Sequence, residues 1–180
     1  MKFIFDFDDV LFHNTEQFKK HMYMCLEKGG ISQDIAREYY KTVRANQFWL
    51  KDMLTHFSLP ESLYEEILKE SKNFINHDVL NIVKKMKKEN CYIVTHGNEN
   101  FQKDKIKNAG IEDLFLEIIV VSDSKKEAIE KICLKHKDEE VVFIDDKVKH
   151  LENLDFKKCP NLKTILFDEE GLSRLRFIIP

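Results

Sequence analysis

Acidic side chains gather at the end of the first apolar segment of the chain. Residues 2–7 (KFIFDF) form a short run rich in Phe and Ile that is typical of a buried strand. Asp6 interrupts this run, Asp8 and Asp9 follow it, and a carboxylate there is costly unless it pairs or binds a cation. In strand geometry Asp6 and Asp8 share a face, where their charges repel unless a metal ion or a proton intervenes. The plain alternative for this segment alone is a strand that runs into an acidic turn.

Polar side chains also follow three later apolar runs. They are Thr95 after residues 91–94, Lys125 after residues 116–121, and Asp145 and Asp146 after residues 141–144. The carboxyl ends of parallel strands meet at one edge of a sheet, so we expect these side chains to gather beside the first acid pair. This convergence is a stronger indication of a site than any one of its members.

The expected cluster combines carboxylates with a hydroxyl and an ammonium group, without histidine or thiolate partners. Oxygen ligands of this kind favour a hard cation and therefore indicate Mg²⁺ rather than zinc. Hydroxyl groups, backbone N–H groups at helix starts and lysines are the usual donors to phosphoryl oxygens. A carboxylate can also attack phosphorus as a nucleophile. The residues therefore indicate phosphoryl transfer through an aspartyl-phosphate.

The elements that would carry these residues alternate between strand and helix after residue 76. With a further strand expected at residues 164–167, the alternation predicts an α/β fold with a doubly wound, mostly parallel five-stranded sheet. Asp78 and Ser124 are candidate helix N-caps, and Gly110 is expected to end a helix that begins at residue 101.

Residues 13–76 have a different pattern, with apolar residues at helical spacing and no strand signal. We expect about four helices here. The chain therefore divides into an α/β core, formed by residues 1–12 and 77–180, and a small all-helical insert of residues 13–76.

The composition is that of an ordinary globular protein of 180 residues, with a net charge of −3. This charge gives no reason to expect a nucleic acid or a membrane surface as partner, and no apolar run is long enough to span a bilayer. Asp6 lies where a signal peptide would need its apolar region, so the cytoplasm is the expected compartment. The four cysteines form no CxxC pair and indicate reduced thiols.

Four segments, in this order, resemble the motifs of the haloacid dehalogenase-like superfamily: FIFDFDDVL, IVTHGN, SDSKKEAI and VVFIDD. The resemblance covers the predicted sheet, and the helical insert lies where the family carries a helical cap. It implies a Mg²⁺-dependent phosphohydrolase that acts on a small soluble phosphoester through an aspartyl-phosphate. A phosphotransferase or mutase of the same superfamily and a non-catalytic phosphoacceptor or binding member are the alternatives.

The resemblance implies a role for each residue of the first two motifs. Asp6 would attack phosphorus and ligate the metal. Asp8 would protonate the leaving oxygen and then activate water, and its main-chain carbonyl would face Mg²⁺. Thr95, His96 and Gly97 would bind the phosphoryl group through a hydroxyl and backbone N–H groups. Because halide-cleaving members lack an acid at the position of Asp8, dehalogenation is disfavoured.

The third and fourth motifs supply charge balance. Lys125 would offset charge on the nucleophile and on the phosphate, and it is preferred to Lys126 because the apolar residues that follow then fall at the familiar offset. Asp145 would ligate Mg²⁺ directly, and Asp146 would act through water or orient Lys125. Asp9 departs from the family, since many members have glycine there.

Two groups of residues leave alternatives open. His96 would either face the substrate or pack over the turn. In the helical insert, Arg37, Lys41 and Arg44 fall at helical spacing. They would form either a solvated helix face, which is the commoner case, or a contact with an anionic substrate.

Overall fold

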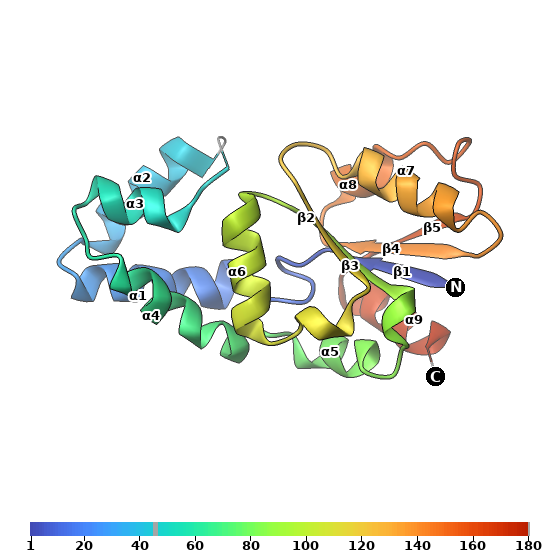
Figure 1. Cartoon of the computed structure of the whole chain (residues 1–180), viewed down its shortest axis with the longest axis horizontal. Helices are drawn as coiled ribbons and strands as arrows, with labels where there is room; N and C mark the ends of the chain where they lie inside the picture. The colour runs from blue at the N-terminus through green and yellow to red at the C-terminus, as the bar shows by residue number, and fades with distance from the viewer. Residues whose placement is uncertain (45–46, 180) are drawn as a thin grey trace.

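Five parallel strands form the sheet of the computed structural model, which describes residues 1–44 and 47–179 (Figure 1). The strands are β1 (Lys2–Phe5), β2 (Cys91–His96), β3 (Glu117–Val121), β4 (Val141–Asp145) and β5 (Leu162–Leu166). Their order is β3-β2-β1-β4-β5, and Phe5 in the central strand is paired with both Ile93 and Ile144. The carboxyl end of β1 therefore lies between those of β2 and β4, at the edge where the polar residues are expected to gather.

Helices cover both faces of the sheet, which confirms the doubly wound arrangement. One face packs against α7 (Lys126–Lys135) and α8 (Val148–Glu152), and the other against α5 (His77–Val83), α6 (Glu99–Ala109) and α9 (Glu169–Ile178). In β1, Ile4 belongs to the first face, whereas Phe3 and Phe5 belong to the second. Burial on both faces explains why the strands are apolar runs rather than alternating patterns.

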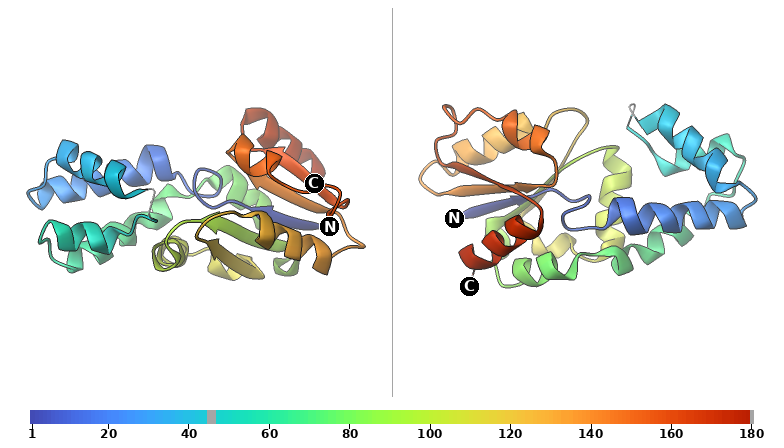
Figure 2. Two further views of the ribbon diagram at one scale, coloured as in Figure 1. Left: turned by 90° about the horizontal axis from the view of Figure 1, so that it is seen from above. Right: turned by 180° about the vertical axis from the view of Figure 1, so that it is seen from behind.

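The remaining helices form one body beside the sheet, which we call the helical segment (residues 14–74; Figure 2). It contains the π-helical turn η1 (Asn14–Phe18), α1 (Lys19–Lys28), α2 (Gln33–Val43), α3 (Leu50–His56), α4 (Ser62–Lys69) and the 3-10 helix η3 (Glu70–Phe74). Short 3-10 turns η4 (Lys88–Asn90) and η5 (Glu112–Leu114) precede β2 and β3. Among the described residues, no helix has the length and apolarity needed to cross a membrane.

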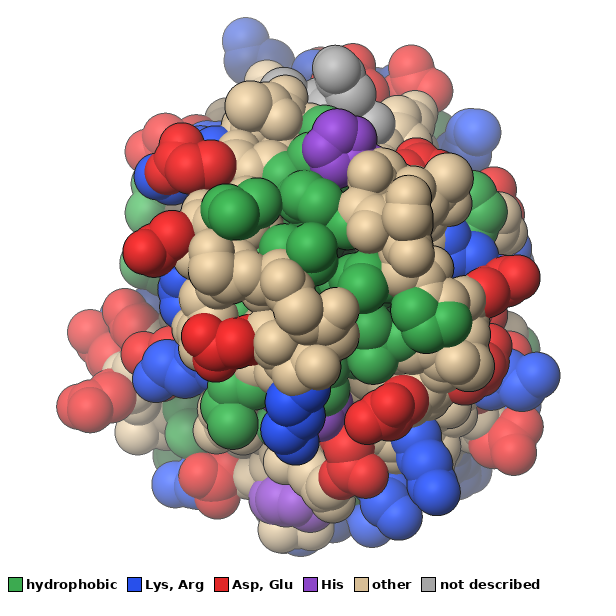
Figure 3. All heavy atoms as spheres, turned by 90° about the vertical axis from the view of Figure 1, so that its left-hand side faces the viewer, with side chains coloured by type: hydrophobic (Ala, Val, Ile, Leu, Met, Phe, Trp, Pro, Cys, Tyr) green, Lys and Arg blue, Asp and Glu red, His purple; other side chains and the backbone are tan. Residues whose placement is uncertain are grey.

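The helical segment packs onto the sheet domain through α6 and a cluster of aromatic rings. Phe12, which follows β1, lies 5.3 Å from Phe18 and 6.1 Å from Phe74 between ring centroids. Phe18 in turn lies 6.1 Å from Phe101 on α6. The boundaries expected at residues 13–76 stay a prediction, because both parts share one hydrophobic cluster. Figure 3 shows the outer face of the helical segment, where charges of both signs surround hydrophobic side chains.

Local signals explain several helix ends and correct two expectations. The N-cap of α7 is Lys125 and not Ser124. Asn76, and not Asp78, caps α5, because its Oδ1 accepts hydrogen bonds from the backbone N–H groups of Asp78 and Val79. Gly110 ends α6 in the left-handed conformation, with a φ of 71°. Helix α9 was not expected from the sequence. Its N-cap is Asp168, whose side chain accepts a hydrogen bond from Gly171 N at 2.7 Å.

Gly171 lets α9 approach the end of β5, which generates a stability prediction. A Cβ atom at this position would lie 1.9 Å from the carbonyl oxygen of Leu166. We expect Gly171→Ala to lower the free energy of unfolding by about 2 kcal/mol, as overpacking against backbone does, in a urea unfolding experiment. Ser173→Ala, on the exposed side of the same helix, is the matched control and should shift stability by less than about 0.5 kcal/mol. Equal midpoints for the two variants would contradict this packing.

Candidate active site

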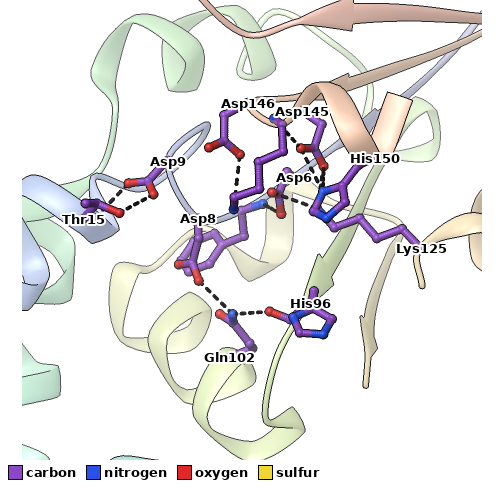
Figure 4. A network of polar contacts seen from close by, with 12 residues as sticks. Asp6, Asp8, Asp9, Thr15, His96, Gln102, Lys125, Asp145, Asp146 and His150 are labelled. Carbon is purple, nitrogen blue, oxygen red and sulfur yellow. Dashed lines mark hydrogen bonds and ion pairs between the residues drawn. The ribbon is translucent and has the colours of Figure 1, made fainter. Parts of the chain in front are cut away.

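A lysine bridges two carboxylates at the carboxyl ends of β1 and β4 (Figure 4). The Nζ atom of Lys125 lies 2.7 Å from Asp6 Oδ2 and 2.6 Å from Asp145 Oδ2. All three residues are buried. Lys126 instead points outward, 4.0 Å from Glu130. Of the two candidate lysines, Lys125 is therefore the one that meets the acids.

The two bridged carboxylates differ in their electrostatic environment. Burial and the charge of Asp145 raise the pKa of Asp6 to about 6, although Lys125 opposes this shift. Asp145 is also buried, but hydrogen bonds from His150, Lys125 and the backbone N–H of Lys147 outweigh burial and lower its pKa. Asp145 is thus the better stabilised anion of the pair.

His150, on α8, joins this cluster and was not foreseen from the sequence. Its Nδ1 atom lies 3.0 Å from both carboxylate oxygens of Asp145. Asp6, Asp145 and His150 each offer a ligand atom, and these atoms all lie within 4.8 Å of one another. The one available signal was its position five residues after Asp145, in the first turns of the following helix.

Asp146 lies beside this cluster but does not contact Lys125, which corrects one of the two roles expected for it. Lys125 is oriented by Asp6 and Asp145 instead. Burial raises the pKa of Asp146, and its Oδ1 atom has no hydrogen-bond partner among the described residues. Lys147 Nζ lies 3.6 Å from this oxygen, which makes a loose ion pair rather than a hydrogen bond. The oxygen-rich donor set is compatible with Mg²⁺.

Asp8 points away from Asp6, toward α6, although strand periodicity predicts a shared face. The reason is that β1 ends at Phe5, so the chain has already turned at Asp8. Lys105 Nζ lies 2.6 Å from Asp8 Oδ1, and Gln102 donates a hydrogen bond of 2.8 Å to Oδ2. Burial alone would raise the pKa of Asp8, but the charge of Lys105 and the hydrogen bonds from Lys105 and Gln102 together lower it, so the carboxylate form is favoured in this conformation.

Lys105 is the second residue that sequence reasoning missed. Its side chain is fully buried, and its ammonium group lies 5.1–5.7 Å from the centroids of four phenyl rings, those of Phe7, Phe12, Phe18 and Phe101. This burial lowers the pKa of Lys105. Its spacing from Phe101, four residues along α6, puts both on one helix face and is the only signal that the sequence contained.

The phosphate-binding residues expected at the end of β2 lie across β1 from Asp145, on the side of Asp6 that also holds Asp8. The buried Oγ1 of Thr95 has no hydrogen-bond partner among the described residues. Gly97 has a φ of 147°, and a Cβ atom there would lie 2.9 Å from Gln102 Nε2, so the turn requires glycine. The ring of His96 lies against the carbonyl oxygen of Ser122, 3.1 Å from Nε2, which favours packing over the turn.

Asp9 keeps the backbone conformation that glycine would adopt, with a φ of 62°. Its carboxylate accepts hydrogen bonds from the backbone N–H of Thr15 at 2.8 Å and from its hydroxyl at 2.6 Å. These bonds hold the beginning of the helical segment. The departure from the family pattern therefore adds a structural contact and directs the extra charge toward Thr15.

Comparison with known proteins bears on the family and the fold. A family model described as haloacid dehalogenase-like hydrolase matches residues 3–152. No curated protein matches the sequence. Solved structures also share the fold at low sequence identity, and three of them illustrate the range.

The first, from Burkholderia xenovorans LB400, is described as a haloacid dehalogenase-like hydrolase; it is 18% identical, covers 96% of this chain and 89% of its own, and has a TM-score of 0.66. The second, YfnB from Bacillus subtilis, is described as a HAD-hydrolase bound to magnesium. It is 16% identical, the match covers 99% of this chain and 97% of YfnB, and the TM-score is 0.58. The third is L-2-haloacid dehalogenase from Xanthobacter autotrophicus. It is 14% identical, the match covers 96% of this chain and 80% of the dehalogenase, and the TM-score is 0.55.

The buried pair of Asp8 and Lys105 generates a prediction about stability. Asp8→Ala leaves a charged lysine unpaired among aromatic rings and should lower the free energy of unfolding by about 3 kcal/mol. Adding Lys105→Met should restore most of this loss, because an apolar side chain of similar length replaces the ammonium group. Urea unfolding of both single variants and the double variant measures the coupling, and strictly additive effects would argue against the ion pair.

Proposed function

This chain belongs to the haloacid dehalogenase-like hydrolase family, and within it we propose that the protein is a Mg²⁺-dependent phosphohydrolase acting on a small soluble phosphoester. The observation that carries the proposal is the buried bridge of Lys125 between Asp6 and Asp145, beside the unpartnered hydroxyl of Thr95. A nucleophilic carboxylate, a fixed positive charge and a free donor are the groups that transfer of a phosphoryl group to a side chain requires.

In the first step Asp6 acts as nucleophile. Its Oδ1 atom accepts a hydrogen bond of 2.7 Å from Phe7 N, and Lys125 pairs with Oδ2, so the orientation of the carboxylate is fixed. One of its oxygens bonds to phosphorus while the bond between phosphorus and the leaving oxygen breaks. Asp8 gives a proton to that oxygen from its acid form, which the pairing with Lys105 disfavours in the conformation seen here. Thr95 and the backbone N–H groups after it donate to the phosphoryl oxygens, and Lys125 offsets their charge.

In the second step Asp8 acts as base. Lys105 and Gln102 stabilise its carboxylate form, which suits it to take a proton from water. The water oxygen bonds to phosphorus, and the bond between phosphorus and Asp6 breaks. The products are inorganic phosphate and the free carboxylate of Asp6, so the chain is ready for another cycle.

Mg²⁺ would be held by Asp6, Asp145 and Asp146, together with the main-chain carbonyl of Asp8. When bound, the ion offsets the negative charge of the phosphoryl group and of the gathered carboxylates. The support for this assignment is the oxygen character of the donor set and the buried Oδ1 atom of Asp146. That atom accepts no hydrogen bond within the described residues and lies 3.6 Å from Lys147 Nζ. His150 is already engaged by Asp145 and is assigned to hold that carboxylate.

We expect Asp6→Asn to abolish hydrolysis of p-nitrophenyl phosphate in the presence of Mg²⁺, because the amide is a poor nucleophile. Asp9→Asn makes the same change of charge in the same loop but keeps an acceptor for Thr15, and it should retain most of the activity. Release of inorganic phosphate is the measurement, since a phosphotransferase would deliver the group to another acceptor. Full activity in Asp6→Asn, or release of halide from a 2-haloacid without phosphatase activity, would refute the proposal.

The role assigned to Asp146 is tested by metal binding. Asp146→Asn removes a charged ligand and should weaken Mg²⁺ binding about tenfold or more, measured by isothermal titration in the absence of substrate. Asp123→Asn, an exposed acid of the third motif loop, is the matched control. Unchanged affinity in Asp146→Asn would move the ion to other ligands.

A further inference from the structure

A cavity of about 120 Å³ lies between the helical segment and α6, on the Asp8 side of the site. Asp8, His96 and Gly97 border it at one end. Its other walls come from η1, α1 and α2 and from the residues around Phe48. If Asp8 protonates the leaving oxygen, the rest of the leaving group must lie on this side and occupy the cavity.

Positive charge dominates the walls of this cavity. Lys19, Arg44 and Lys105 border it, whereas Asp8 is the only acid among the described residues that do so. Lys105 is neutralised by its pair with Asp8. Lys19 and Arg44 have no ion pair and no side-chain hydrogen bond within the part of the chain that the structure describes. Two cations are therefore available to a ligand.

The position of Lys19 shows that its charge acts within the site. Its Nζ atom lies 5.0 Å from the ring centroid of Tyr40, a contact that holds the ammonium group at the cavity wall. The charge of Lys19 contributes to the lowered pKa of both Asp8 and Lys105. A ligand that touches Asp8 therefore also meets the field of Lys19.

Not all basic residues of the helical segment border the cavity. Arg37 lies over the ring of Tyr23, 4.5 Å from its centroid, and Lys41 pairs with Glu38. These two residues thus belong to a solvated helix face, as the commoner interpretation of the sequence holds. Arg44, one turn further along, borders the cavity instead.

We propose that the leaving group of the substrate carries a second anionic group, a carboxylate or a phosphate, which Lys19 and Arg44 bind. The apolar walls from Phe18, Met22 and Phe48 suit the short carbon chain between the two anionic groups. This inference rests on the proposed phosphohydrolase activity and names its class of substrate. A neutral leaving group would leave both cations facing the cavity without a partner.

Three phosphoesters of matched length test the inference: propyl phosphate, 3-(phosphonooxy)propionate and propane-1,3-diyl bisphosphate. The wild type should prefer one or both compounds with a second anionic group to propyl phosphate by about tenfold or more in kcat/KM, mainly through KM. The carboxylate and bisphosphate arms distinguish the two possible anions. Equal kcat/KM on all three substrates would overturn the inference.

Variants assign the preference to the two cations. Lys19→Gln and Arg44→Gln should each reduce the ratio of kcat/KM for the preferred substrate with a second anionic group to that for propyl phosphate by about tenfold, and Lys19→Arg should restore it. Lys41→Gln, on the solvated face of α2, is the control and should leave the ratio unchanged. Far-UV circular dichroism shows whether each variant is folded.

The two proposals fail in distinguishable ways. Absence of Asp6-dependent hydrolysis of p-nitrophenyl phosphate rejects the phosphohydrolase activity and, with it, this substrate class. Asp6-dependent hydrolysis together with a ratio that Lys19→Gln and Arg44→Gln do not change rejects the substrate class alone.

Discussion

Electrostatic repulsion between Asp6 and Asp145 is the constraint on which the site depends. Parallel pairing of β1 and β4 puts Phe5 level with Ile144, so the next residue of each strand contributes a buried carboxylate at the same edge. Two such charges are tolerated because Lys125 bridges them, and the start of α7 delivers that lysine. Asp146 adds a third carboxylate, which lies 3.6 Å from Lys147 Nζ, so three carboxylates face two lysines. A divalent cation would offset the remaining negative charge and that of an incoming phosphoryl group.

A second ion pair gives the other acid of the first motif a separate environment. Lys105 and Gln102, both on α6, hold Asp8 on the side that faces the helical segment. Asp6 and Asp8 are therefore distinct in surroundings as well as in sequence. Burial raises the pKa of Asp6, which shares Lys125 with Asp145. The charge of Lys105 and the hydrogen bonds from Lys105 and Gln102 outweigh burial at Asp8 and lower its pKa. This separation supports different tasks for the two carboxylates, with a nucleophile on one side and proton transfer on the other.

The sequence predicts the sheet and the residues at its edge because both follow from local patterns. Apolar runs identify strands, and the polar residue after each run identifies a strand end, as for Thr95 and Asp145. Lys105 and His150 escape this reasoning, since each lies in the polar pattern of a helix and becomes significant only when tertiary packing turns it inward. The direction of Asp8 escapes it too, because periodicity fails once β1 has ended. Which carboxylates pair with Lys125 could not be predicted either, because only the side-chain geometry shows that Asp6 and Asp145, and not Asp146, contact it.

Direct detection of the phosphorylated side chain tests the central claim. Wild-type protein and the Asp8→Asn variant, in which water activation is removed, would be mixed with Mg²⁺ and p-nitrophenyl phosphate and quenched in acid within milliseconds to seconds. Mass spectrometry of the peptide that contains residues 3–19 then locates any phosphoryl group. The account predicts phosphorylation of Asp6, with more of it in Asp8→Asn. A phosphoryl group on Asp8 or Asp9, or phosphate release from the wild type with Asp6 never modified in either protein, would contradict it.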